Sequence, residues 1–342
     1  MVVPVFDGHN DALTREDHAA IVTGRSGGHL DLPRMRGGGM RGGIFAVFTP
    51  SPGVRSDPVP RADGVREFEA ASAVERGEAA AHATVVAGRL LSLEQAGHVR
   101  VARTVDDLDA ARDGGPPAAV LHLEGAEAID PDLEALDLWH VVGLRSIGPV
   151  WSRSNAFGHG VPFIAPSSPD TGPGLSDAGR AMVRRCAELG IALDVSHLNE
   201  EGFWDVARLD RAPIVASHSA AHALCASSRN LTDDQLDAIG ASGGLIGIVF
   251  ACAFLRPDFA DDSDTPIGLI AEHARYVADR IGVAHVALGS DFDGATIPDG
   301  LGDVAGLPRL LAALSDLGFN EEEVTAIAWN NWRRVLGECW SA

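Results

Sequence analysis

Short runs of apolar and β-branched residues recur along the chain, and each is followed by a segment whose apolar residues have helical spacing. This alternation is typical of βα units arranged around a parallel sheet. The pattern predicts an α/β fold, a single (β/α)₈ TIM barrel with insertions that spans residues 1–342. The predicted strands are eight runs within the 342 residues, at 2–6, 43–48, 118–123, 143–150, 191–196, 213–217, 245–250 and 286–289.

The alternative fold for the same pattern is an open, doubly wound sheet. Such sheets often carry a GxGxxG turn after the first strand, and this chain has none there. The glycine-rich segment 37–43 follows no predicted strand, so we expect a flexible connection into the second strand. The stretch 61–97 has the Ala, Glu, Leu and Arg content of one or two long helices. Segment 162–174, rich in Pro, Ser and Gly, is expected over the barrel mouth, either as a lid or as an ordinary surface loop.

Polar side chains of the kinds that bind metals stand where the predicted strands end. In a parallel barrel these ends meet on one face, where the active sites of this fold are built. Any one of these residues alone could be structural, but three histidines and three carboxylates together predict a metal centre. Two of them are only two positions apart, so in an extended segment they point to the same side. The six residues are His9, Asp11, Glu124, His197, His218 and Asp291.

The ligand types indicate the metal and its chemistry. Imidazole with carboxylate favours Zn²⁺, with Mn²⁺, Co²⁺ and Fe²⁺ as competitors. A second ion that shares Glu124 as a bridge accounts for more ligands than one catalytic zinc needs, and two ions about 3.5–4 Å apart would hold a bridging hydroxide as nucleophile. Asp291 is then left as a proton shuttle to the leaving group. The five candidate ligands are His9, Asp11, Glu124, His197 and His218.

Composition and charge narrow the class of protein. Asp and Glu number 48 against 27 Lys and Arg, and the formal net charge of −21 disfavours nucleic acid and anionic membranes as partners. No stretch approaches the ~20 apolar residues of a membrane span, and the N-terminus lacks the basic region of a secretion signal. The four cysteines form no CxxC pair, which argues against a zinc finger or a disulfide framework. We therefore expect a cytoplasmic protein.

Several sequence blocks resemble the membrane dipeptidase (renal dipeptidase) family of binuclear zinc peptidases, which is related to the amidohydrolase barrels. The blocks are DGHND at 7–11, DVSH at 194–197, SHSAAHALCASSRNLTDDQL at 217–236 and HVALGSDFDG at 285–294. The resemblance runs nearly from end to end and implies an amidohydrolase-like barrel. It also implies a metallodipeptidase with two Zn²⁺ per chain that cleaves free dipeptides and tolerates or prefers a D-residue at the C-terminal position.

The resemblance implies the same metal ligands as the strand ends do. By this resemblance His9 and Asp11 bind the first zinc, and His197 and His218 bind the second. Glu124 bridges the two ions. Asp291 looks like the catalytic acid/base, and Arg229 in SSRN looks like the residue that binds the substrate's free carboxylate. At the end of the fourth strand the animal enzymes have a histidine that contacts the scissile carbonyl, whereas this chain has Trp151. We expect Trp151 to be a wall of the substrate pocket. Oxyanion stabilisation from that position is then missing, or is supplied by His159, by zinc or by neither.

Two other functional interpretations stay open. Another binuclear amide hydrolase, acting on acylated amino acids or cyclic amides, would use the same ligands, but a cation aimed at a C-terminal carboxylate is useful only to substrates that carry one. A metal-binding barrel without turnover is disfavoured by the intact ligand set and Asp291. A small dipeptide is the expected partner, and a homodimer is one option for the assembly. We expect His122, His140 and His222 to be structural or surface residues.

Overall fold

A ring of parallel strands forms the centre of the protein. The computed structural model describes residues 3–51, 58–61, 63–209 and 212–341. Within them two runs of parallel neighbours, β1-β2-β6-β7-β9 and β10-β11-β12, make up most of the ring, and bridges from Asp194 to Val215 and from Asn10 to Phe292 join the runs at both edges. The predicted (β/α)₈ barrel is confirmed. Its strands are β1 (Val5–Asn10), β2 (Met40–Phe48), β6 (Ala118–Glu124), β7 (Leu144–Gly148), β9 (Ala192–Leu193), β10 (Val215–Ser219), β11 (Leu245–Ile248) and β12 (Val286–Leu288).

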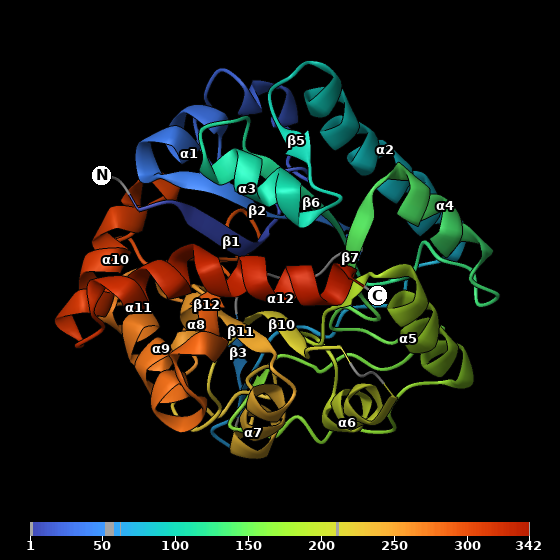
Figure 1. Ribbon diagram of the computed structural model, residues 1–342. Helices are drawn as coiled ribbons and strands as arrows, with labels where there is room; N and C mark the ends of the chain where they lie inside the picture. The colour runs from blue at the N-terminus through green and yellow to red at the C-terminus, as the bar shows by residue number, and fades with distance from the viewer. Residues whose placement is uncertain (1–2, 52–57, 62, 210–211, 342) are drawn as a thin grey trace.

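Helices surround this ring (Figure 1), and several begin where the sequence offers a capping side chain. Asp31 accepts a hydrogen bond from the backbone of Arg34 in the first helix, and Thr232 forms a reciprocal capping box with Gln235; both satisfy N–H groups that a first helical turn leaves free. The α-helices are α1 (Leu32–Gly38), α2 (Arg76–Gln95), α3 (Val105–Arg112), α4 (Glu134–Val142), α5 (Asp177–Leu189), α6 (Glu200–Leu209), α7 (Asp233–Ala241), α8 (Cys252–Leu255), α9 (Gly268–Ile281), α10 (Leu307–Asp316), α11 (Glu321–Thr325) and α12 (Asn331–Trp340). Shorter helical turns are η1 (His18–Ile21), η2 (Val283–His285), η3 (Val304–Gly306) and the π-helical η4 (Ala326–Asn330).

Helix α12 closes the end of the barrel at which the strands begin. Residues from the first halves of the strands, among them Phe6, Val215 and Leu245, share one apolar cluster with side chains of η4 and α12. Trp329 and Trp332 are fully buried there, and burying side chains of this size contributes several kcal/mol, at about 1.5–3 kcal/mol for each large apolar group. Figure 1 shows α12 crossing in front of the strands. The polar residues gather at the other end of the barrel, where the strands finish.

The glycine-rich segment 37–43 is not the flexible connection that we expected. Gly38 ends α1, Gly39 caps the helix in the left-handed conformation (φ 78°), and β2 starts directly at Met40. Glycine adopts this cap without the steric penalty of a Cβ. A Cβ on Gly38 would also collide with the backbone of Val304. These glycines therefore make a tight helix-to-strand junction possible.

The stretch 61–97 holds one long helix, α2, and is not helical from its beginning. The residues before α2 include β4 (Arg66–Glu67), which pairs antiparallel with β3 (Val59–Pro60) and with β8 (Ile164–Ala165). A further short strand, β5 (Arg100–Val101), runs parallel to β6. The small β3-β4-β8 sheet thus ties the insertion after β2 to the predicted loop 162–174.

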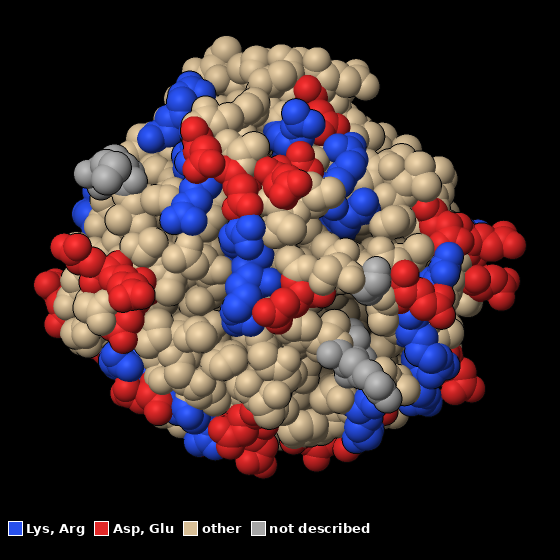
Figure 2. All heavy atoms as spheres, viewed as in Figure 1, with Lys and Arg blue, Asp and Glu red and all other residues tan. Residues whose placement is uncertain are grey.

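The surface carries charges of both signs. On the face seen in Figure 2, basic side chains lie among acidic ones in short alternating stretches. Within the described ranges, none of the helices combines the length and the apolar character that a membrane crossing needs.

Candidate metal centre

The barrel brings the six predicted strand-end residues to one place. Five of them are at most 6% exposed, and Asp291 is partly exposed. Ionisable groups are buried in such numbers only where they are paired or coordinate metal. The six come from five strands around the ring: His9 and Asp11 at the end of β1, Glu124 at the end of β6, His197 after β9, His218 in β10 and Asp291 after β12.

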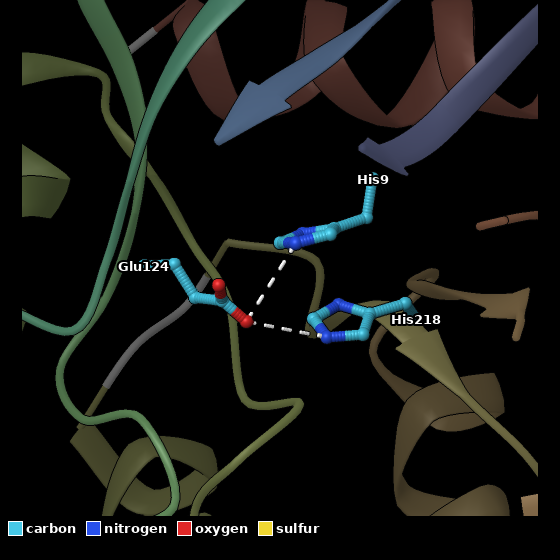
Figure 3. A group of neighbouring side chains, drawn as sticks. All are labelled: His9, Glu124 and His218. Atoms are coloured by element: carbon cyan, nitrogen blue, oxygen red, sulfur yellow. Dashed lines mark ion pairs between the residues drawn. The ribbon is translucent and has the colours of Figure 1, made fainter. Parts of the chain in front are cut away.

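One carboxylate oxygen lies at the centre of the group. Glu124 Oε1 is 2.9 Å from His197 Nε2, 3.4 Å from His218 Nε2 and 3.6 Å from His9 Nε2. Figure 3 shows the carboxylate pointing at the imidazoles of His9 and His218 from the opposite side. The two Nε2 atoms of His197 and His218 are themselves 3.1 Å apart. Three imidazole nitrogens therefore converge on one oxygen.

A second group of donor atoms adjoins the first. Donor atoms of His9, Asp11 and Asp291 lie within 4.8 Å of one another, and His9 Nε2 is 3.6 Å from Asp11 Oδ2. Asp291 has a left-handed backbone conformation (φ 61°), which non-glycine residues rarely adopt. Its N–H donates to the carbonyl of His9 at 3.0 Å. This contact between the ends of β12 and β1 fixes the place of the Asp291 side chain.

The donor atoms fit a pair of divalent cations. Both ring nitrogens of His9 and Oδ1 of Asp11 are buried without a hydrogen-bond partner in the described structure, and such orphaned atoms need a partner. Burial, with a smaller effect of Arg229, lowers the pKa of His197 to about 4. A neutral imidazole is the form that binds a metal ion. Histidine and carboxylate donors suit Zn²⁺ and similar ions.

Asp291, like the ligand candidate Asp11, has a carboxyl whose pKa is raised by burial, to about 6 in the case of Asp11. Burial raises the pKa of the Asp291 carboxyl, the negative charges of Asp11 and Glu124 raise it further, and His9 and Arg229 oppose the change, with a net value of about 7. A carboxyl that titrates near neutrality can hold or release a proton under ordinary conditions. This property suits the acid/base role expected from the sequence.

Sequence reasoning missed the residues that hold the histidines in place. Ser152 Oγ is 2.8 Å from Nδ1 of His197, and Ser217 Oγ is 2.8 Å from Nδ1 of His218. Ser217 in turn donates to the buried carboxylate of Asp194. Such partners orient metal ligands and set their tautomers. The available signal was Asp194 itself, a charged residue within the predicted apolar run 191–196.

Arg229 lies beside His197 and His218. Its side chain is buried, and Nη2 donates to the carbonyl of His218 at 2.7 Å and lies 3.3 Å from His197 Nε2. Among the described residues it has no carboxylate within 4.0 Å, and its Nε has no hydrogen-bond partner. Asp233, an acidic residue four positions further along the chain, pairs with Arg280 and not with Arg229. A buried cation is thus free to receive an anionic group.

The candidate centre opens into a cavity of about 1020 Å³. Trp151 lines this cavity, as expected for a pocket wall, and its ring centroid is 5.8 Å from that of His197. His159 pairs with Ser154 at 2.9 Å and is not among the residues that line the described cavity. Asp293 also lines the cavity, but it is held by Arg25 at 3.2 Å.

The remaining histidines have ordinary partners or lie outside the cavity. His122 is buried with Nδ1 2.9 Å from Ser146 Oγ, although it also lies within 4.8 Å of donor atoms of His9 and Asp194. His222 meets the carbonyl of Ser167 at 2.7 Å. His140 is in α4, on the outer layer of the barrel.

Comparison with known proteins places the chain in a family. The model of the membrane dipeptidase family, peptidase family M19, matches residues 1–341. An uncharacterized protein in the pqqA 5' region of Klebsiella pneumoniae is 47% identical over 250 residues, 73% of this chain and 92% of that protein.

Solved structures show the same fold. The crystal structure of a dipeptidase described as a metallopeptidase of family M19 has 46% identity and a TM-score of 0.93, with 100% of both chains covered. A metallopeptidase from Rhodobacter sphaeroides, liganded with a phosphinate mimic of the dipeptide L-Ala-D-Ala, has 44% identity and a TM-score of 0.93, with 99% of this chain and 100% of that chain covered. This chain belongs to the membrane dipeptidase family of metallopeptidases, peptidase family M19.

Proposed function

We propose that the protein is a dipeptidase that holds two zinc ions. The single observation that carries this proposal is the oxygen Glu124 Oε1, faced by three imidazole nitrogens within 3.6 Å. Glu124 would be the ligand shared by both ions, because one of its oxygens faces His9 on one strand end and His197 and His218 on two others. The first ion would be held by His9, Asp11 and Glu124, and the second by Glu124, His197 and His218.

When bound, a zinc pair supplies Lewis acidity toward the scissile carbonyl and makes water nucleophilic near neutral pH. The chain's own residues supply the remaining functions. Asp291, whose carboxylate lies beside the donor atoms of His9 and Asp11, can take up a proton and deliver it to the departing amine nitrogen. An amine leaves poorly without a proton, so this transfer lowers the barrier to cleavage.

The charges around the cavity match a free dipeptide. Arg229 presents an unpaired guanidinium beside His197 and His218, and a guanidinium binds a carboxylate through charge-assisted hydrogen bonds. A dipeptide with its C-terminal carboxylate at Arg229 would place its peptide bond near His197 and His218, which lie next to this guanidinium.

A D-residue at the C-terminal position is part of the proposal. The mimic bound by the Rhodobacter sphaeroides relative represents L-Ala-D-Ala, and that relative is 44% identical to this chain over nearly its whole length. We propose that this chain accepts the same stereochemistry.

A dipeptide panel after zinc loading tests the proposed function. The panel holds free dipeptides with L- and D-residues at each position, and amine release is measured together with the zinc content of each sample. We expect hydrolysis of L-L and L-D dipeptides, with the L-D series at least as fast. A sample that contains its full zinc complement and cleaves no free dipeptide would contradict the proposal.

A further inference from the structure

One side of the cavity is built from five aromatic side chains. Neighbouring rings touch in sequence: Phe48 and Trp151 have centroids 4.9 Å apart, Trp151 and Phe163 5.6 Å, and Phe163 and Phe254 5.3 Å. Phe68 joins at 5.8 Å from Phe163. All five line the cavity. We call this surface the aromatic wall: Phe48, Phe68, Trp151, Phe163 and Phe254.

The wall is assembled by insertions and not by the barrel alone. Phe68 directly follows β4 and Phe163 directly precedes β8, so the small β3-β4-β8 sheet brings them together. The backbone N–H of Phe68 donates to the carbonyl of Phe163 at 3.0 Å. The main structural consequence of this small sheet is therefore an apolar surface beside the metal donors.

Buried polar groups hold part of the wall rigid. The guanidinium carbon of Arg153 lies 5.2 Å from the ring centroid of Trp151 and 5.5 Å from that of Phe48. Arg153 is itself fixed by an ion pair with Glu127 at 2.8 Å and by Ser51 at 2.9 Å. A preorganised surface loses little conformational entropy when it binds a ligand. Contacts with this wall therefore stabilise the complex without a large opposing loss of entropy.

The position of the wall tells which part of a dipeptide it meets. The rings of Trp151 and Phe163 lie 5.8 and 6.1 Å from the ring of His197. At one end of the wall, the ring centroid of Phe254 lies 5.8 Å from the guanidinium carbon of Arg229. A residue whose carboxylate sits at Arg229 and whose amide nitrogen sits at the metal donors is therefore next to the wall along its whole length.

We propose that the aromatic wall binds the side chain of the substrate's C-terminal residue and makes the enzyme selective for large apolar and aromatic residues there. This inference rests on the proposed dipeptidase function and names its substrate class. The cavity of about 1020 Å³ leaves space for such a side chain, and burial of apolar surface against the rings favours it over alanine.

Two matched substrate series test the inference. One series varies the C-terminal residue, L-Ala-Xaa with Xaa as Ala, Leu or Phe in both stereoisomers, and the other varies the N-terminal residue, Xaa-D-Ala. For the preferred stereoisomer we expect kcat/KM to rise roughly 10- to 100-fold from Ala to Phe at the C-terminal position. The gain in the N-terminal series should be at least several-fold smaller. Equal gains in both series, or no gain at the C-terminal position, would overturn the inference.

Variants connect the selectivity to the wall. Phe163→Leu and, independently, Phe68→Leu should lower the Phe-to-Ala ratio of kcat/KM by about 5- to 10-fold. Phe319→Leu, which removes a buried ring that packs against Arg275 outside the cavity, is the control and should leave the ratio unchanged. The wild-type ratio needs no variant, so a misfolded variant does not remove the test. Hydrolysis without C-terminal selectivity would overturn the wall alone, whereas no hydrolysis of any dipeptide would overturn the proposed function as well.

Discussion

The hydroxyl of Ser217 lies 2.8 Å from Nδ1 of His218, and it donates its own proton to Asp194. A serine hydroxyl has a single hydrogen, so toward the imidazole this oxygen can only accept. Nδ1 of His218 therefore carries the ring hydrogen, and the lone pair of Nε2 faces Glu124 at 3.4 Å. Asp194 thus determines, through one serine, which nitrogen of His218 is available to a metal ion.

Removal of this serine should weaken metal binding. We expect Ser217→Ala to lower zinc affinity by about 10- to 100-fold, because the tautomer and orientation of His218 are no longer fixed. Titration against a competing chelator measures the change. The control is Ser146→Ala, which removes a buried serine 2.9 Å from Nδ1 of His122, a histidine outside the proposed ligand set. Equal losses in the two variants would contradict a specific role for Ser217.

The shared ligand sets the expected metal content. We predict two zinc ions per chain in the loaded protein, measured by elemental analysis on samples of known concentration. Glu124→Gln keeps the size of the side chain but weakens its donation to both ions, so the variant should hold fewer ions and lose activity. A reproducible content near one ion in the wild type would contradict the binuclear centre.

Asp291 should matter to turnover more than to metal content. Loss of acid/base assistance typically lowers kcat by about 10²- to 10⁴-fold, and we expect Asp291→Asn to do so while the zinc content persists. Asp293 offers a comparison, because its carboxylate pairs with Arg25 and accepts from the backbone of His29. Asp293→Asn should lower the melting temperature. If Asp291→Asn instead loses its zinc, Asp291 is a ligand.

The sequence predicted the barrel because a strand that is buried on both faces consists mostly of apolar residues. Such short apolar runs recur along the chain between helical segments. It did not predict α1, whose last residues are glycines that read as a loop, although Gly39 is there to cap the helix at φ 78°. The sequence also did not predict the two-residue strands β3, β4 and β8, for a different reason. A strand of two residues has no periodicity, and only its pairing partner defines it.

The residues of the site also divide into those that the sequence predicted and those that it did not. His9 and Glu124 could be found because charged side chains at strand ends are exceptional in an apolar pattern. Ser152 and Ser217 could not, since serine is common and its partner is set by a rotamer and a distance of 2.8 Å. The contact between Phe68 and Phe163 joins residues 95 positions apart through the small sheet. The sequence around either phenylalanine does not indicate that the other one is its partner.

A buried histidine away from the metal centre should make stability depend on pH. In α9, His273 accepts from the backbone N–H of Ala221 at 3.1 Å and lies 3.1 Å from the carbonyl of Leu255, so the neutral form donates from Nε2. Burial lowers the pKa of His273 to about 4. The unfolded chain, with a pKa near 6.5, therefore binds more protons below pH 6.5, and stability falls as the pH drops from about 6.5 to 4.

The size of this effect follows from the shift of the pKa. At about 1.4 kcal/mol for each pKa unit, His273 alone should remove roughly 3 kcal/mol of folding free energy by pH 4. Chemical denaturation of wild type and His273→Gln at several pH values isolates this contribution, because other titrating groups are common to both. The variant should lose less stability than the wild type between pH 6.5 and 5, and parallel losses would contradict the assignment.

The guanidinium of Arg229, whose Nε has no hydrogen-bond partner among the described residues, separates a dipeptidase from a broader amide hydrolase. Charge-assisted hydrogen bonds to a carboxylate contribute about 1.5–3 kcal/mol, or roughly 10- to 150-fold in binding. A free dipeptide should therefore be cleaved with a kcat/KM at least tenfold above that of its C-terminal amide, and Arg229→Ala should remove most of the difference. Arg229→Lys is the matched variant, because it keeps the charge but not the planar fork. Its preference for the acid over the amide should lie between those of the wild type and Arg229→Ala. Equal kcat/KM for acid and amide in the wild type would mean that the enzyme does not recognise the carboxylate, and hydrolysis of acylated amino acids or cyclic amides would then explain the same metal centre better.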